Sequence, residues 1–235
     1  MELLPDFTFE RFIPTASASQ AYRTCVAQLD CIATASGVLL LHGPCGTGKT
    51  HLLHAVGHAV RDRFPVACLM CTTAADLSAD LLDAARRDQC ALLHRKYCSL
   101  DVLLIDDLHT LVGKPATQRE LAALLRRSVA AGTYVLCASA FGPQAIAEFT
   151  SGLAVLPTYR HVALRPASQS ELRHIIGVLA AAEQLTVPTS MVDLLARGCC
   201  GDVRRAVGAI TQLNAAKRLP PTGAISPGAC RLTCD

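Results

Sequence analysis

An eight-residue segment of this 235-residue chain has the residue types and spacing of a phosphate-binding loop. In order, its residues are Gly43, Pro44, Cys45, Gly46, Thr47, Gly48, Lys49 and Thr50. Glycines let successive backbone N–H groups curl around phosphate oxygens. The lysine ammonium can reach the β- and γ-phosphates, and the threonine hydroxyl can bind Mg²⁺. The segment therefore predicts a site for ATP or ADP together with Mg²⁺.

Two adjacent carboxylates further along the chain are the natural complement of such a loop. Residues 101–107 read Asp-Val-Leu-Leu-Ile-Asp-Asp, which is a buried-strand pattern ending in Asp106 and Asp107. A phosphate loop needs an acidic partner for its metal at the end of a neighbouring strand. We expect Asp106 to hold magnesium, usually through water, and Asp107 to polarise the attacking water. Asp107 and Lys49 are thus the expected catalytic residues. A strand that simply ends in a polar turn is the structural alternative.

The elements around the loop favour an α/β fold. Residues 37–42 (GVLLLH) predict a strand before the loop, and residues 50–63 predict a helix after it. The other predicted strands are residues 66–71, 101–105, 134–139 and, more weakly, 161–164. The other predicted helices are residues 75–97 and 118–131. Apolar strands that alternate with helices indicate a five-stranded parallel sheet covered on both faces.

The pattern changes after Pro166. Helical periodicity then continues without a strand, in residues 168–184, 188–197 and 202–218. Ser168 and Glu171 have the spacing of a capping box. We expect an α/β core at residues 1–166, a small three-helix subdomain at residues 167–218, and a flexible tail rich in Pro and Gly at residues 219–235.

Composition narrows the class of protein. The chain is 51% hydrophobic and 17% charged, which is apolar enough for a sizeable core and excludes intrinsic disorder. No apolar run reaches the ~18–20 residues of a membrane helix, and the acidic amino terminus, broken by Pro5, is unlike a signal peptide. We therefore expect a cytoplasmic protein with no membrane partner. A net charge of only +3 gives no argument for duplex DNA binding.

The two motifs also resemble a known family. Residues 48–57 (GKTHLLHAVG) and 96–114 (KYCSLDVLLIDDLHTLVGK) look like the ATPase domain of the DnaA family of bacterial replication proteins, which are AAA+ ATPases. The likeness begins at residues 7–12 (FTFERF), similar to the family's motif beside the adenine. It ends near residues 201–210 (GDVRRAVGAI), similar to the family's sensor 2 helix. The resemblance implies an AAA+ core followed by a helical lid.

The resemblance assigns roles to individual residues. The family's nucleotide contacts carry over to Gly46, Gly48, Lys49, Thr50, His51, Asp106 and Asp107. Sensor 2 falls on Arg204, which would reach the phosphates from the lid. Lys114 matches a position that grips single-stranded DNA, although an ordinary solvated lysine explains it equally well. Residues 74–97 occupy the place of the family's helical insertion.

Two departures from the family concern hydrolysis. The sensor 1 strand normally ends in Thr-Ser-Asp, whereas residues 137–140 read Cys-Ala-Ser-Ala, with Ala140 at the aspartate position. The family's arginine-finger segment corresponds to residues 150–156, and no Arg or Lys occurs between Ser128 and Tyr159. Such a finger accelerates phosphoryl transfer by orders of magnitude. Arg160 is the nearest substitute for the missing finger. We therefore expect nucleotide binding with weak or absent hydrolysis, and whether the chain is an enzyme stays open.

Three functions remain as alternatives. The first is an ATP- or ADP-binding, Hda-like protein that acts in the initiation of chromosomal replication or its regulation. It would dock on DnaA, on other replication proteins, on single-stranded DNA or on a second copy through the AAA+ interface. Residues 219–235 are too few for the family's origin-reading domain, so sequence-specific binding to duplex DNA is not expected. The second is an active ATPase of the DnaC or IstB type that loads or remodels a helicase or transposition complex. The third is an interaction module with nucleotide as a structural ligand.

Two other groups of residues have the spacing of metal ligands. His51, His54 and His58 fall on one face of a predicted helix, but no carboxylate or cysteine nearby completes a metal site. Cys68 and Cys71 have C-x-x-C spacing along a predicted strand, where they would point to opposite faces. We expect neither metal nor redox chemistry at these residues.

Overall fold

The computed structural model describes residues 1–30, 32 and 36–218, so the predicted tail at residues 219–235 lies outside the described residues. The chain divides into two compact units, Met1–Arg165 and Pro166–Asp235.

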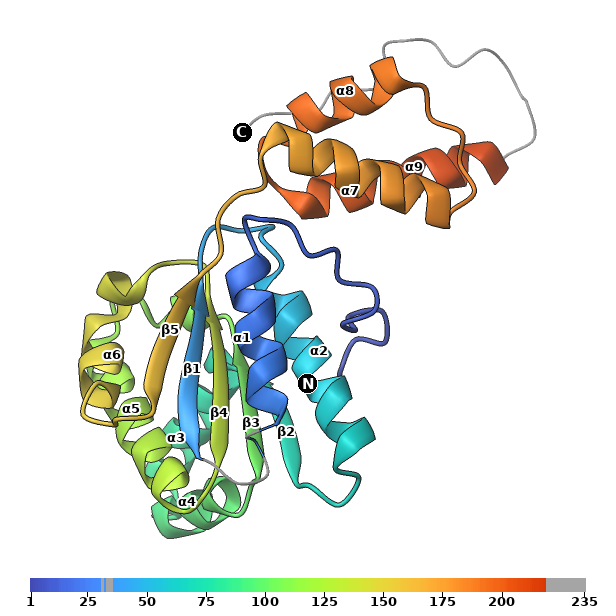
Figure 1. Ribbon diagram of the computed structural model, residues 1–235. Coiled ribbons are helices and arrows are strands. Elements are labelled where there is room, and N and C mark those ends of the chain that lie inside the picture. Colours follow the sequence, from blue (N-terminus) through green and yellow to red (C-terminus); the bar gives the residue numbers. More distant parts are fainter. Residues whose placement is uncertain (31, 33–35, 219–235) are drawn as a thin grey trace. The chain divides into compact units, whose positions relative to one another are not determined.

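The first unit is built on a five-stranded parallel sheet (Figure 1). Its strands are β1 (Gly37–His42), β2 (Leu69–Thr73), β3 (Val102–Asp106), β4 (Tyr134–Ser139) and β5 (Tyr159–Ala163). They follow the order β2-β3-β4-β1-β5. Every residue of β3 and β4 is buried, as expected for central strands with helices on both faces. The expected α/β class with a five-stranded parallel sheet is confirmed.

Helices cover both faces of this sheet (Figure 1). One face carries α1 (Ser19–Leu29) and α2 (Lys49–Arg63). The other face carries α3 (Ala74–Arg86), α4 (Cys90–Cys98), α5 (Pro115–Ala130) and α6 (Ala147–Leu153), with short 3₁₀ turns at Leu108–Leu111 and Pro143–Ile146. Successive side chains of β1 point to opposite faces of the sheet. Leu39 and Leu41 pack with α2, and Val38 and Leu40 pack with the helices on the other face.

Several predicted boundaries were wrong for local reasons. The strand expected at residues 66–71 begins at Leu69, because residues 64–67 form a turn that leaves Val66 95% exposed. The helix expected at residues 75–97 is two helices, α3 and α4. Between them Asp88 has a left-handed φ of 55°, a conformation that Asp tolerates better than most residues. Helices α1 and α6 were not predicted.

The second unit consists, in its described part, of α7 (Gln169–Ala182), α8 (Thr189–Gly198) and α9 (Val203–Arg218). The predicted capping box begins α7: the Glu171 amide donates to Ser168 Oγ over 3.3 Å, and the Ser168 amide donates to Glu171 Oε2 over 2.6 Å. An ion pair of 2.6 Å between Arg173 and Asp193 joins α7 to α8. Across the part of the chain that the structure describes, no helix has the length and apolar character needed to span a bilayer.

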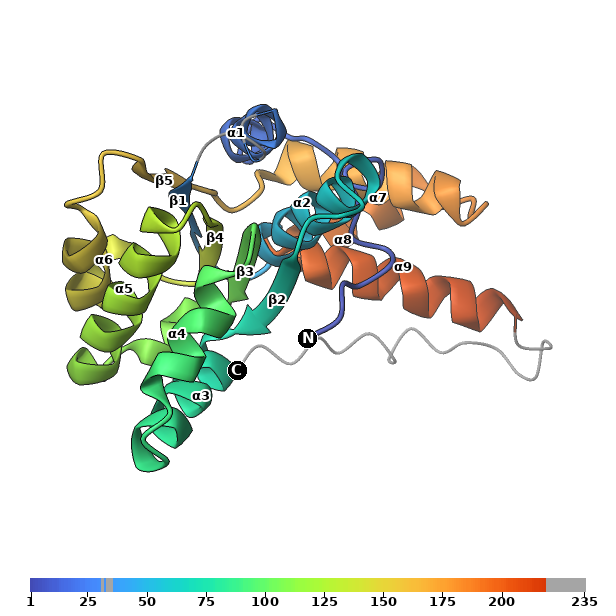
Figure 2. The ribbon, with the colours of Figure 1, turned by 90° about the horizontal axis from the view of Figure 1, so that it is seen from below.

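Residues 1–12 form an irregular segment with turns at residues 4–7 and 8–12, here called the strap, that runs along α2 (Figure 2). The amino-terminal ammonium group donates to the carbonyl of Cys71, in β2, over 2.9 Å. Leu3 is buried against Gly57, where a Cβ atom would lie only 2.7 Å from Leu3 Cδ2. The glycine in the middle of α2 therefore lets the strap approach the helix closely.

Three histidines of α2 bind the strap. The Leu4 amide donates to His54 Nδ1 over 3.1 Å, and His58 Nε2 lies 2.8 Å from the Leu4 carbonyl oxygen. His51 Nε2 lies 2.8 Å from the Thr8 carbonyl oxygen. Phe7 stacks on the His51 ring at 4.8 Å and meets the His54 ring edge-on at 5.7 Å. These histidines thus contact backbone and aromatic rings, and the described residues include no group of three side chains that could hold a metal ion.

The buried His54 predicts an acid-sensitive fold. Burial lowers the pKa of His54 to about 4, whereas an unfolded histidine titrates near ~6.5. The neutral ring therefore contributes stability that is complete above ~6.5 and is lost as the pH falls toward 4. Between pH 7.5 and pH 5 the free energy of unfolding should drop by up to about 2 kcal/mol through this residue alone. Urea unfolding at both pH values measures this drop.

The matched variant is His54→Asn, whose Oδ1 can still accept from the Leu4 amide but does not titrate. Its free energy of unfolding should depend less on pH in this range than that of the wild type. Equal pH dependence of the two proteins would contradict the assignment.

Candidate functional site

The loop between β1 and α2 has a backbone that only glycines adopt readily. Gly43, Gly46 and Gly48 have φ values of 148°, 74° and 96°, all in the left-handed region. A Cβ atom on Gly43 would lie 2.1 Å from the Leu164 carbonyl oxygen, so a side chain cannot fit there. The loop leads directly into the first turn of α2, where free backbone N–H groups and the helix dipole favour an anion. This geometry fits a phosphate group.

The loop is closed by bonds to one of its own carbonyl oxygens. Lys49 Nζ donates to the Pro44 carbonyl over 2.7 Å, and Thr47 Oγ1 donates to the same oxygen over 2.9 Å. Lys49 is only 9% exposed although it is charged. Because a buried ammonium needs oxygen partners, its position over the loop suits it to donate to phosphate oxygens in place of the carbonyl. Cys45, between them, is exposed.

Thr50 and Asp106 meet although they come from different elements. Asp106 ends β3, is 5% exposed, and accepts hydrogen bonds from the Thr50 hydroxyl and, over 2.7 Å, from the Asp107 amide. Burial raises the pKa of Asp106, and these two hydrogen bonds oppose that shift. A hydroxyl and a buried carboxylate in contact are the oxygen ligands that Mg²⁺ takes beside substrate phosphates. The pair thus fits the predicted magnesium site.

Asp107 has the opposite environment to Asp106. Its φ of 56° is left-handed, and its side chain is 52% exposed. Its carbonyl accepts from Thr110 Oγ1 over 2.9 Å, and its Oδ1 lies 3.8 Å from His109 Nδ1. The unusual backbone turns this carboxylate away from the buried end of β3 and into solvent. A hydrated carboxylate next to a buried one is suited to orient a water molecule.

An aromatic residue that sequence reasoning did not single out borders the loop. Phe12, at the end of the strap, lies with Cε2 2.9 Å from where a Cβ atom of Gly48 would be. Its ring stacks on Tyr22 at 5.6 Å and meets His51 edge-on at 5.2 Å. Gly48 is thus needed for close approach as well as for its backbone angle. The only sequence signal for Phe12 was the resemblance of residues 7–12 to the family's adenine-side motif.

Two further candidate residues lie on exposed positions. Lys114 follows the 3₁₀ turn that comes after β3 and immediately precedes α5, close in sequence to the exposed Val112. Arg204 belongs to the second unit, in the first turn of α9, where its amide donates to Asp202 Oδ1 over 2.8 Å. Its Nε lies 3.8 Å from the same carboxylate oxygen.

The segments that depart from the resembled family form β4 and α6 with their flanking turns, and their side chains make other contacts. At the end of β4, Ser139 Oγ accepts from the Phe141 amide over 3.2 Å, and the small Ala140 lies between them. On α6, Glu148 pairs with Arg119 at 3.3 Å. A guanidinium does reach this helix from α5, since Arg126 donates to the Gly152 carbonyl over 2.8 Å. Its charge is thus engaged within the unit.

Comparison with known proteins agrees with this geometry. Residues 3–156 match the family model of the bacterial DnaA ATPase domain. The chromosomal replication initiator protein DnaA of Chloroflexus aggregans is 33% identical over 225 residues, which cover 94% of this chain and 47% of that protein. The chain thus spans about half the length of the curated relatives it matches.

Solved structures show the same fold. Domain III of the Thermotoga maritima replication initiation protein DnaA superposes with a TM-score of 0.81 and 28% identity, covering 92% of this chain and 91% of that one. A replication initiator DnaA bound to AMPPCP and single-stranded DNA shares the fold at a TM-score of 0.76 and 24% identity, covering 91% of this chain and 66% of that one. The chain therefore belongs to the family of the bacterial DnaA ATPase domain, within the AAA+ proteins.

Proposed function

We propose that this DnaA-like ATPase domain binds ATP or ADP with Mg²⁺ at residues 43–50. The observation that carries the proposal is the loop itself: three left-handed glycines, a buried Lys49 poised over it, and a hydroxyl–carboxylate pair beside it. Backbone amides of Gly46 and Gly48 and the first turn of α2 would bind phosphate oxygens. Lys49 would exchange the Pro44 carbonyl for the β- and γ-phosphates.

Thr50 and Asp106 are the residues that would hold magnesium, which supplies charge neutralisation when bound. A cation there would favour the ionised form of Asp106, which burial alone disfavours. Asp107 would orient a water molecule from its exposed position. Arg204, from the second unit, is proposed to add a positive charge on the phosphates. The strap is proposed to lie on the adenine side, as its resemblance to the family motif implies.

The substitution Lys49→Ala tests nucleotide binding. Loss of the ammonium removes charge-assisted hydrogen bonds to phosphate, so the dissociation constant for MgATP and MgADP should rise about 100-fold. Isothermal titration calorimetry measures it. The matched control is Lys96→Ala, because Lys96 is a surface lysine paired with Asp80 at 2.8 Å outside the loop. Wild-type protein that binds neither nucleotide, or Lys49→Ala protein that binds like the wild type, would contradict the site.

We also propose that hydrolysis is slow when the chain acts alone. The support is the chemistry missing from residues 137–140 and 150–156, where the family has an aspartate and an arginine. The two described guanidinium contacts with α6 have other partners: Arg126 donates to the Gly152 carbonyl, and Arg119 pairs with Glu148. Without a cation at the γ-phosphate of a neighbour, charge that develops during transfer stays uncompensated.

Purified protein should accordingly turn over ATP below about 10⁻³ s⁻¹, the range of phosphate-loop enzymes that act without an arginine finger. Phosphate release under saturating MgATP measures the rate, and Lys49→Ala protein gives the background. Brisk turnover that disappears in Lys49→Ala protein would contradict the proposal. If single-stranded DNA also stimulated that turnover, an active loader of the DnaC or IstB type would be the better description.

The biological role that fits these properties is Hda-like: a cytoplasmic protein that acts on replication initiation by docking on DnaA through the AAA+ interface. The support is membership of the family together with the departures at the hydrolytic residues. Lys114 and Val112 are exposed and therefore accessible to single-stranded DNA. A DnaA of the same fold binds single-stranded DNA. Self-association would use the same interface.

The docking proposal is tested with cognate DnaA. Size-exclusion chromatography with light scattering should detect a complex in the presence of ATP or ADP, because the bound nucleotide forms part of an AAA+ interface. Lys49→Ala protein should lose the dependence on nucleotide. Absence of a complex with ATP, with ADP and without nucleotide would contradict the proposed role.

A further inference from the structure

The strap approaches the phosphate loop at its far end, through Phe12 beside Gly48. Before that point its backbone is bound to α2 at two places, at Leu4 by His54 and His58 and at Thr8 by His51. Since His51 directly follows Thr50, the residue that binds the Thr8 carbonyl is covalently joined to the site itself. A rigid connection thus runs from the strap into the phosphate loop.

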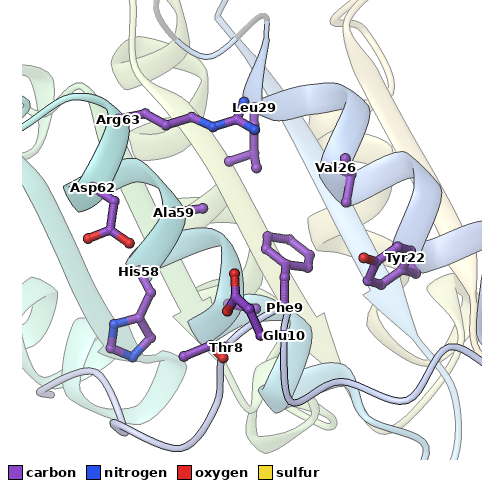
Figure 3. A pocket seen from close by; sticks show the side chains of 11 residues that line it. Thr8, Phe9, Glu10, Tyr22, Val26, Leu29, His58, Ala59, Asp62 and Arg63 are labelled. Atoms are coloured by element: carbon purple, nitrogen blue, oxygen red, sulfur yellow. The ribbon is translucent and has the colours of Figure 1, made fainter.

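Packing does not replace these hydrogen bonds in the middle of the strap. A cavity of about 360 Å³ lies between the strap, α1 and α2 (Figure 3). From the strap it is lined by Thr8, Phe9 and Glu10, and among its other lining residues are Tyr22 and His58. No residue of the loop lines the cavity, so it is separate from the phosphate site. The inner side of the strap is incompletely filled here, where Phe9 meets the Tyr22 ring edge-on at 5.6 Å, so the histidine contacts add to the packing that holds the strap.

The histidine rings are suited to fixed, neutral hydrogen bonding. His54 accepts from the Leu4 amide at Nδ1, so its proton is on Nε2. His51 faces the Thr8 carbonyl with Nε2, which must therefore donate. The His51 ring is also held between Phe7, stacked at 4.8 Å, and Phe12, edge-on at 5.2 Å. One ring thus fixes both the backbone and the aromatic side chains of the strap.

We propose that His51 and His54 are positioning residues for the nucleotide base: they hold the strap against α2 so that its aromatic end borders the base without further ordering. The inference rests on the proposed nucleotide binding and goes beyond it: His51, for which the resemblance implied a nucleotide contact, and His54 would act on base affinity through the strap. A strap that is already in place loses no conformational entropy when the nucleotide binds. A released strap would lower the apparent affinity by the fraction of time that it is correctly placed.

Paired substitutions separate the hydrogen bonds from the rings. His51→Phe keeps the aromatic stacking and loses the donor to Thr8, whereas His51→Gln keeps a donor at the position of Nε2. His54→Leu loses the acceptor for the Leu4 amide, whereas His54→Asn keeps an acceptor at the position of Nδ1. The control is His94→Phe, on α4, where the ring contacts Arg127 rather than the strap.

The test compares dissociation constants for MgATP and for magnesium tripolyphosphate, which has the phosphates without the base. His51→Phe should weaken MgATP binding about tenfold, as expected when a strap is correctly placed about a tenth of the time. Tripolyphosphate binding should change less than about twofold, and His51→Gln should recover most of the MgATP affinity. In hydrogen exchange without nucleotide, the Leu4 amide should exchange faster in His54→Leu than in the wild type and His54→Asn.

The outcomes distinguish this inference from the proposed function. Wild-type protein that binds neither MgATP nor tripolyphosphate would overturn nucleotide binding and, with it, the positioning role. Wild-type protein that binds MgATP, with His51→Phe unchanged, would overturn the positioning role alone. Equal weakening of MgATP and tripolyphosphate by His51→Phe would also overturn it, since the residue would then act on the phosphate loop rather than on the base.

Discussion

The left-handed backbone at Gly43, Gly46 and Gly48 is the constraint on which the rest of the site depends. It lets the chain reverse between a buried strand and a helix while its amides point inward, an arrangement closed to residues with a Cβ atom. The turn fixes where α2 begins and thereby the positions of Lys49 and Thr50. The sheet order brings the end of β3 to the same edge, where Asp106 meets Thr50 across one intervening strand.

The sequence predicted best what is encoded locally. The strand at residues 37–42, the loop and the helix after it follow from contiguous patterns of apolar residues and glycines, and the structure shows all three. The strand expected at residues 66–71 was misplaced because apolar composition alone does not reveal the turn that exposes Val66. The role of His54 was beyond reach, since its partner Leu4 is separated from it by 50 positions and offers only a backbone amide.

Binding and turnover depend on different parts of this molecule. The phosphate loop and the Thr50–Asp106 pair lie within one unit, where Lys49 donates to the Pro44 carbonyl and the Asp107 amide donates to Asp106. The parts that the family uses to sense and cleave the γ-phosphate correspond to residues 137–140 and 150–156, which fold normally but lack the charges. Under the proposed function, bound ATP would persist as ATP until it dissociates. The domain's partners would then respond to which nucleotide is bound.

The most direct test of the central claim is a titration of ¹⁵N-labelled protein with MgADP, followed by the chemical shifts of its backbone amides. Residues 46–50 and Asp107 should show the largest changes, because their N–H groups would face or adjoin the phosphates and the metal. Saturable changes confined to other places, such as the cavity beside Phe9 and Tyr22, would contradict the account. So would a spectrum that MgADP leaves unchanged.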